Sequence, residues 1–212
     1  MVAVLENRKR KKKSPIKVGP DSNGMEMTPE EFDRADFDDG YCYELIHEVL
    51  IVSPIPSEAE ADPNEELGRM LRNYQEYHPD GESLDVTLFE RYVYMEDSRR
   101  RADRVIWAGL GRRPKPGEAP TIVVEFVSKR KRDRQRDYET KREEYQEIGV
   151  QEYWIIDRFE KTMVAHSRLD GRFKKKVIRA NQTYRTPLLP GFELPLQRLF
   201  EIANRWQDED AS

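Results

Sequence analysis

The stretch "TIVVEFVSK", residues 121–129, has the composition of a strand at the centre of a sheet, with one exception. Its residues are mainly branched or aromatic, which is typical of a strand whose two faces are both buried. The exception is Glu125, because an ionised carboxylate in a dry strand costs several kcal/mol unless a cation or strong donors compensate it. Val123 and Val127 share its side of the strand. The sequence therefore predicts that Glu125 is either protonated or paired with a cation.

The elements on either side of this stretch follow the order helix, three strands, helix, strand. Apolar side chains at the i, i+3, i+4 and i+7 positions mark the first helix, and Gly149 ends the second. This order is typical of a mixed sheet with helices on both faces, an α/β sandwich. The expected ranges are 63–77 and 133–150 for the helices, and 83–96, 102–109, 121–128 and 151–157 for the strands.

Further elements are expected outside this core. A capping box at Thr28 begins a short helix. Residues 38–54 are interpreted as one long strand or as a hairpin that bends near residues 47–48. The later elements are a hairpin over 160–186, with "LDG" at its turn, and a closing helix over 196–206 that covers one end of the sheet.

Composition narrows the kinds of site that the chain can build. Of its 212 residues only Cys42 is a cysteine, so no intrachain disulfide and no cysteine-rich zinc site can form. The three histidines, His47, His78 and His166, lack the spacing of a metal motif. No stretch approaches the ~20 apolar residues of a membrane span, and a cytoplasmic protein with no membrane segment and no small-molecule cofactor is expected. A site must therefore be built mainly from carboxylates, lysines and arginines.

Charge is unevenly distributed along the chain, whose net charge is −4. Residues 1–20 carry seven Lys or Arg and one acid, a net +6, which leaves −10 for the remainder. The block "RKRKKK", residues 8–13, contains nothing apolar to pack, so residues 1–27 are expected to form a disordered basic arm. The arm is interpreted either as a nonspecific phosphate-binding segment or as a solvated tail. One domain over 28–206 and an acidic tail over 207–212 complete the expected organisation.

Three side chains near the predicted sheet could act together. Asp103 opens the strand before Glu125, and carboxylates on neighbouring strands can approach each other. Lys141 falls in the sheet-facing stripe of the following helix. Two carboxylates suit Mg²⁺, and residues 129–142, with eight Lys or Arg against three acids, form a cationic rim. These groups suit the hydrolysis of a polyanion. The alternative is that Asp103 is a turn residue, that Glu125 and Lys141 form a structural ion pair, and that the rim is a solvated helix face.

The same residues resemble a known family. An aspartate, a strand glutamate and then a lysine in this core are similar to the PD-(D/E)XK nuclease superfamily, and within it the chain resembles the Uma-two family of putative restriction endonucleases. The resemblance runs from about Met27 to Trp206, and "YQEIGVQEYW", residues 145–154, is its most specific stretch. It implies a restriction-endonuclease-like α/β fold, in which a mixed β-sheet is flanked by helices in an α-β-β-β-α-β core with an added β-hairpin. The other matching stretches are "YELIHEVLIVSPIPS", "RRADRVIWA", "TIVVEFVSK" and "RDYETKREEYQEIGVQEYWIID".

Carried over residue by residue, the family pattern assigns Asp103 and Glu125 to the motif acids. The usual lysine two positions after the glutamate is Val127 here, so the lysine role passes to Lys141 in the next helix. Ala102 replaces the proline that usually precedes the aspartate, and "KRKRDR" replaces a Pro-Ser-Thr type of sequence after the strand, which puts the choice of substrate in question. Ser128 matches the serine that closes the strand, and Glu44, in "YELI", matches an acidic position near the site.

The resemblance implies Mg²⁺-dependent hydrolysis of DNA phosphodiester bonds, with Mn²⁺ as an alternative metal. Asp103, Glu125 and Glu44 would bind the metal, and Lys141 would orient or help to deprotonate the attacking water. A homodimer is expected, because a double-strand break commonly calls for two active sites. The competing hypothesis is a catalytically inactive nucleic-acid-binding or assembly protein on the same fold. The residues expected to contact the DNA backbone are Lys129, Arg130, Arg132 and Arg134.

Overall fold

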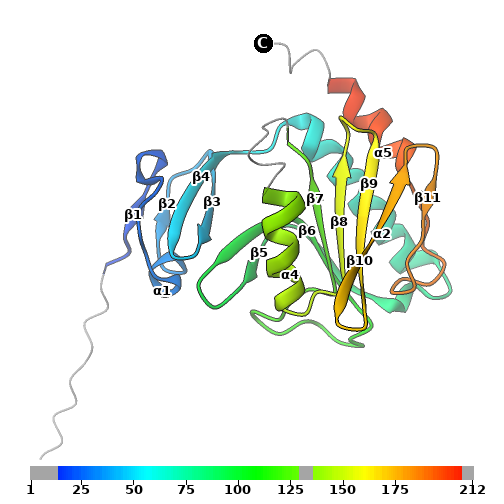
Figure 1. The fold of residues 1–212 in the computed structure, drawn as a ribbon, viewed down its shortest axis with the longest axis horizontal. Coiled ribbons are helices and arrows are strands. Elements are labelled where there is room, and N and C mark those ends of the chain that lie inside the picture. Colours follow the sequence, from blue (N-terminus) through cyan, green and yellow to red (C-terminus); the bar gives the residue numbers. More distant parts are fainter. Residues whose placement is uncertain (1–13, 129–135, 207–212) are drawn as a thin grey trace, which may run out of the picture.

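A computed structural model describes residues 14–128 and 136–206 of the chain. Within these residues the centre of the molecule is an eight-stranded mixed sheet (Figure 1), with the strand order β10-β9-β8-β7-β6-β3-β4 and with β5 also paired to β6. β7 and β8 are parallel, and β6 is antiparallel to β7. The strands are β3 (Tyr41–Ile46), β4 (Val49–Pro54), β5 (Leu84–Tyr94), β6 (Arg99–Ala108), β7 (Ile122–Phe126), β8 (Glu152–Asp157), β9 (Thr162–Leu169) and β10 (Arg172–Arg179).

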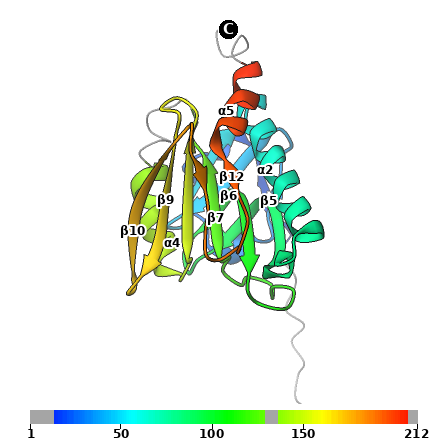
Figure 2. The same ribbon diagram turned by 90° about the vertical axis from the view of Figure 1, so that its right-hand side faces the viewer.

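Helices cover both faces of this sheet. Two of them, α2 and α5, lie on one face, and α4 lies on the other (Figure 2). Leu67 of α2 packs in the same core as Val124 of β7, whereas Tyr145 of α4 packs with Val123 on the opposite face. The predicted α/β sandwich is therefore confirmed. The helices are α2 (Glu58–Tyr77), α5 (Leu196–Ala203) and α4 (Lys141–Glu147), which follows a π-helical turn (Arg136–Thr140).

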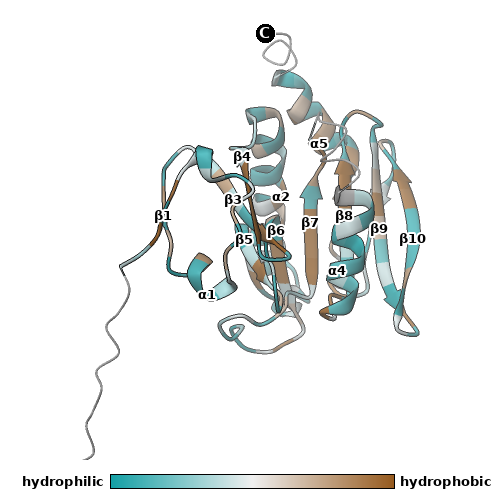
Figure 3. Cartoon of the chain, turned by 60° about the vertical axis from the view of Figure 1, so that its left-hand side comes forward, coloured by the Kyte–Doolittle hydropathy of each residue, from teal (hydrophilic) through white to brown (hydrophobic). Residues whose placement is uncertain are grey.

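Strand β7 is buried along its whole length, as its composition predicts. Its ribbon is mostly brown in Figure 3, whereas β10 at the edge of the sheet is largely teal. β10 has the sequence "RFKKKVIR", and charged side chains on an edge strand oppose pairing with another sheet. The carboxylate of Glu125 is therefore held in the interior, not at the rim of the sheet.

A smaller lobe, built on the β3–β4 hairpin, precedes α2. His47 and Glu48 turn this hairpin with φ angles of 48° and 62°, which confirms the hairpin interpretation. The predicted capping box is present: Thr28 Oγ1 accepts the Glu31 N–H at 3.2 Å, and the Glu31 carboxylate accepts the Thr28 N–H at 3.1 Å. Val18 is buried in this lobe, so packing begins upstream of residue 28. The lobe also contains β1 (Lys17–Val18), a 3₁₀ turn (Pro20–Ser22), α1 (Pro29–Phe32) and β2 (Asp36–Phe37).

The prediction that the first long helix begins at residue 63 was wrong, because α2 begins at Glu58. The Ser57 N–H donates to the Glu60 carboxylate at 3.0 Å, which is one half of a capping box that starts the helix earlier. Pro63 lies inside α2. Pro63 is the sixth residue of α2, where proline removes the N–H that would bond to the carbonyl of residue 59 and its ring crowds that carbonyl.

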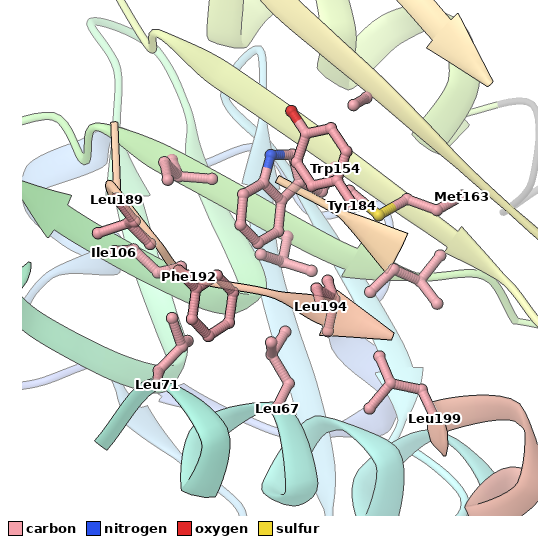
Figure 4. Packing of buried hydrophobic residues seen from close by; sticks show 14 of the residues in the cluster. Leu67, Leu71, Ile106, Trp154, Met163, Tyr184, Leu189, Phe192, Leu194 and Leu199 are labelled. Carbon is pink, nitrogen blue, oxygen red and sulfur yellow. The ribbon is translucent and has the colours of Figure 1, made fainter. Parts of the chain in front are cut away.

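The second hairpin is confirmed, with Asp170 and Gly171 at its turn at φ angles of 51° and 77°. Beyond it, Phe192 and Tyr184 join Trp154 and Leu67 in the larger apolar core (Figure 4). No helix in the described ranges is long and apolar enough to span a membrane. The basic block 8–13 and the acidic tail lie outside these ranges. The remaining elements are a 3₁₀ turn (Gly81–Ser83), β11 (Thr183–Tyr184), β12 (Leu194–Pro195) and a final 3₁₀ turn (Asn204–Trp206).

Candidate active site

Glu125 is buried in β7 and faces α4. Lys141 Nζ lies 2.9 Å from Glu125 Oε1, and the Tyr145 hydroxyl donates to the same oxygen at 3.0 Å. Lys141, on the following helix, is thus a cation that pairs with Glu125, as the ion-pair alternative predicts. A buried charge is tolerated when it is both paired and hydrogen-bonded, and this carboxylate is both.

These two partners of Glu125 come from successive turns of α4. Lys141 and Tyr145 are four residues apart, so their side chains lie on one helix face, and both are buried. Burial and the negative charge of Glu125 raise the pKa of Tyr145 well above its ordinary value, so the phenol stays protonated and acts as a donor. Val127, at the family's usual lysine position, packs in the apolar cluster that contains Tyr145.

Asp103 lies on β6, the strand beside Glu125. The two strands pair at Arg104 and Val124, and just beyond this pair Asp103 Oδ2 accepts the Phe126 N–H at 2.6 Å. Asn64 of α2 donates to the Asp103 carbonyl at 2.9 Å. The Asp103 carboxylate is thus fixed to the residue that follows Glu125, and it remains partly exposed.

A pocket of about 210 Å³ opens beside Asp103. Asp103 lines it, whereas Glu125, Lys141 and Glu44 do not. The pocket is also lined by Glu90 of β5, which lies between the residues paired with Arg104 and Ala102 and has a φ angle of 46°. A non-glycine residue in this conformation is strained, and such residues cluster at functional sites.

Glu44 is buried on β3, on the other side of β6. Its Oε1 accepts the backbone N–H of Arg101 at 3.1 Å. Its charge adds to that of Glu125 in raising the pKa of Tyr145. Burial, together with the charges of Asp103 and Glu44, also raises the pKa of Cys42 to about 11. Glu44 is therefore within electrostatic range of the groups around Asp103 and Glu125.

The other predicted features of the site are a shared metal centre, Ser128 and the DNA contacts. Among the described residues, no three His, Cys, Asp or Glu side chains are grouped so that they could hold one metal ion together. Ser128 is the last residue before the gap at 129–135 and is partly buried. The predicted DNA contacts, Lys129, Arg130, Arg132 and Arg134, lie outside the described residues.

Three contacts of the site were missed from the sequence: the Tyr145 bond to Glu125, the Asn64 bond to Asp103, and an ion pair between Arg100 and Glu144. The position of Tyr145, one turn after Lys141 in the same stripe, was a usable signal. The other two contacts join residues about forty positions apart, and no local pattern indicates them.

The fold and these contacts define a class of protein. A large mixed sheet flanked by helices is the restriction-endonuclease-like fold, and in this chain an aspartate and a glutamate lie on adjacent central strands with a lysine beside the glutamate. The predicted fold is confirmed, and the lysine that contacts Glu125 lies on α4 and not on β7.

Within that class the chain belongs to the Uma2 family, described as "Putative restriction endonuclease", which it matches over residues 29–197. A crystal structure of a putative nuclease of the DUF820 group from Anabaena variabilis has a similar fold, with a TM-score of 0.66 at 16% sequence identity; the match covers 84% of this chain and 99% of that chain. No curated protein matches the chain. The family indicates a nuclease, and the solved structure supports the fold.

Proposed function

We propose that the chain is a metal-dependent endonuclease that hydrolyses phosphodiester bonds in DNA. The observation that carries this proposal is the buried contact of Lys141 with Glu125, next to the residue that binds Asp103. The match to a restriction endonuclease family over most of the domain supports it. A cytoplasmic location is part of the proposal and rests on the single cysteine.

Asp103 and Glu125 have the chemistry to hold a divalent metal. Mg²⁺ takes oxygen ligands, commonly one or two carboxylates together with water molecules, and these two carboxylates lie on adjacent strands. Glu44 is a candidate for a further, more distant contribution to the binding of this metal. Mn²⁺ prefers the same kinds of ligand. When bound, such a metal lowers the pKa of a coordinated water and stabilises the charge that develops on the phosphate.

Lys141 would supply a fixed positive charge beside these carboxylates. Its ammonium group is compact and carries donors that can orient a water molecule or stabilise a negatively charged transition state. The bond from Tyr145 holds Glu125 in place for this contact. Since Asp103 is the partly exposed member and lines a pocket, we propose that the phosphate approaches from that side.

The basic segments would supply affinity for the nucleic acid. Lys129, Arg130, Arg132 and Arg134 are proposed to contact phosphates, which position DNA without reading its sequence. Deletion of residues 1–20 should lower the affinity and reduce the slope of log K against log salt by about 0.9 for each phosphate that the arm neutralises in the wild type. Unchanged affinity would identify the arm as a solvated tail.

A homodimer is proposed, because a double-strand break needs two sites.

Cleavage of plasmid and linear DNA with Mg²⁺, with Mn²⁺ or with excess chelator tests the proposal. Asp103→Asn and Glu125→Gln should abolish metal-dependent cleavage, with circular dichroism showing that each variant is folded. Glu152→Gln, which alters another buried glutamate on the neighbouring strand, is the matched control and should retain activity. DNA binding without cleavage under either metal would establish the inactive binding protein instead. Wild-type cleavage by Asp103→Asn would contradict the site assignment.

A further inference from the structure

Four arginines of β6 flank Asp103 in the sequence, and each of them binds a different part of the molecule. Of these partners, the one bound by Arg100 lies on the same helix as Lys141. The partners are Asp33, next to α1, for Arg99; Glu144 of α4 for Arg100; Glu90 of β5 for Arg101; and Asn64 of α2 for Arg104.

The pair of Arg100 and Glu144 is buried and has two parallel contacts. Arg100 Nε lies 2.6 Å from one oxygen of Glu144, and Nη2 lies 2.6 Å from the other. Arg100 is 0% exposed and Glu144 is 9% exposed. A planar guanidinium that meets a carboxylate in this way fixes orientation as well as distance.

The two residues lie on the two elements that carry Asp103 and Lys141. Arg100 precedes Asp103 by three positions on β6, and Glu144 follows Lys141 by three positions on α4. Residues three apart on a helix are neighbours on its surface. The pair therefore fixes the helix that carries Lys141 against the strand that carries Asp103, at the level of the candidate site.

This contact is poorly explained as a source of stability. A buried ion pair often stabilises a protein no better than apolar residues of similar volume, because both charges lose their hydration. Within the described residues, Arg100 Nη1 is also buried without a hydrogen-bond partner, which adds a further desolvation cost. Unlike an apolar pair, this ion pair gives β6 and α4 a defined geometry relative to each other.

We infer that Arg100 and Glu144 are positioning residues that place Lys141 against Glu125; this inference rests on the proposed function. In most members of the superfamily the lysine would share a rigid strand with the glutamate, but here Val127 occupies that place and the lysine sits on a separate helix. The long lysine side chain can meet Glu125 at 2.9 Å only while that helix is held in place.

Arg100→Lys keeps the charge but removes the two-pronged geometry of the pair. For metal-dependent DNA cleavage, kcat should fall about 10- to 100-fold, while KM changes less than about twofold because substrate binding is untouched. Glu144→Gln tests the same pair from the helix side and should give the same division between kcat and KM. The matched control is Arg99→Lys, which breaks a two-pronged pairing of the adjacent residue with Asp33 and should leave kcat unchanged.

Two readouts separate positioning from a general loss of folding. In a Lys141→Ala background, Arg100→Lys should cause no further loss of kcat, because the residue it positions is already gone; equal losses in both backgrounds would overturn the inference. In a crystal structure of Arg100→Lys, Lys141 Nζ should lie farther from Glu125 Oε1 than in the wild type, and an unchanged distance would also overturn it. The measurement of this distance does not require cleavage activity. If the wild type cleaves no DNA, the proposed function is rejected, and the distance in the variant still decides the inference.

Discussion

Glu125 in β7 and Glu152 in β8 are both buried on neighbouring parallel strands, but they face opposite sides of the sheet and have different partners. Glu152 is bonded by four uncharged donors, two on each carboxylate oxygen. Glu125 has a lysine and a tyrosine among its partners, and both contact its Oε1. The donors to Glu152 are Trp154 Nε1 at 2.8 Å, Thr186 Oγ1 at 2.9 Å, and Ser167 Oγ and Tyr184 OH at 3.0 Å each.

We interpret this difference as that between a structural carboxylate and a carboxylate of the proposed site. A carboxylate has about four lone-pair sites, and the four donors to Glu152 occupy that number while they tie β8 and β9 to the β11 region. Glu125 is paired instead with Lys141, whose ammonium group can also donate hydrogen bonds to a ligand. Its neighbour Asp103 lies at a pocket, whereas Glu152 belongs to the interior. Substitutions at the two glutamates should therefore have opposite profiles.

The largest expected effect comes from removing the charge beside Glu125. Lys141→Ala should lower kcat for DNA cleavage by about 10²- to 10³-fold, as loss of a transition-state donor does. It should also lower the free energy of unfolding by about 3–5 kcal/mol, because Glu125 is left as an unpaired buried charge. Cleavage assays and chemical denaturation measure the two quantities.

A double variant, Glu125→Gln with Lys141→Met, distinguishes these two losses. It removes both charges at similar volume, so much of the stability should return, whereas cleavage should remain absent. Activity in this double variant would show that the pair is structural and that the difference from Glu152 has no catalytic meaning.

At Glu152 the effect should be on stability alone. Glu152→Gln places an amide nitrogen, itself a donor, against two donors, so the free energy of unfolding should fall by about 3 kcal/mol. Cleavage measured well below the unfolding temperature should match the wild type. A loss of kcat without a loss of stability would mean that Glu152 contributes to the activity of the proposed site.

The sequence identified Glu125 in this comparison and missed Glu152. Glu125 interrupts a run of apolar residues, and Lys141 lies in a stripe with helical spacing, so local periodicity was enough to link them. Glu152 stands at the start of "EYWIID" and resembles an ordinary strand end. Its donors Tyr184 and Thr186 lie more than thirty positions away. Such contacts depend on how the β11 region folds back over the sheet, which no local pattern determines.

A third buried polar side chain, His166 on β9, extends the comparison to pH. Burial, with the nearby charges of Arg142 and Lys175, lowers the pKa of His166 to about 4. The unfolded chain then binds a proton more readily than the folded one between about pH 6.5 and pH 4, so stability is fully present above this window and is lost as pH falls through it. The free energy of unfolding should drop by about 2 kcal/mol between pH 7.5 and pH 5.

His166→Phe is the control for this effect. The ring packs near Tyr153 and Phe173, so an aromatic replacement keeps the apolar contacts and removes the titration. The wild type and His166→Phe should therefore diverge as pH falls, while carboxylates titrate equally in both. Parallel stability curves would show that His166 does not cause the pH dependence.

The smallest effects, and the closest test of the comparison, come from two tyrosines. Tyr145 donates to Glu125 and Tyr184 donates to Glu152, each at 3.0 Å. Phenylalanine at either position removes one hydrogen bond to a charged group, so both variants should lose about 1.5 kcal/mol of unfolding free energy. Only Tyr145→Phe should lower kcat, by about 10-fold, because only that bond orients a carboxylate of the site. The two changes are chemically identical and alike in their effect on stability. A difference in kcat between the variants would therefore have to come from different roles of Glu125 and Glu152, and equal kcat values would show that the two glutamates do not differ in this way.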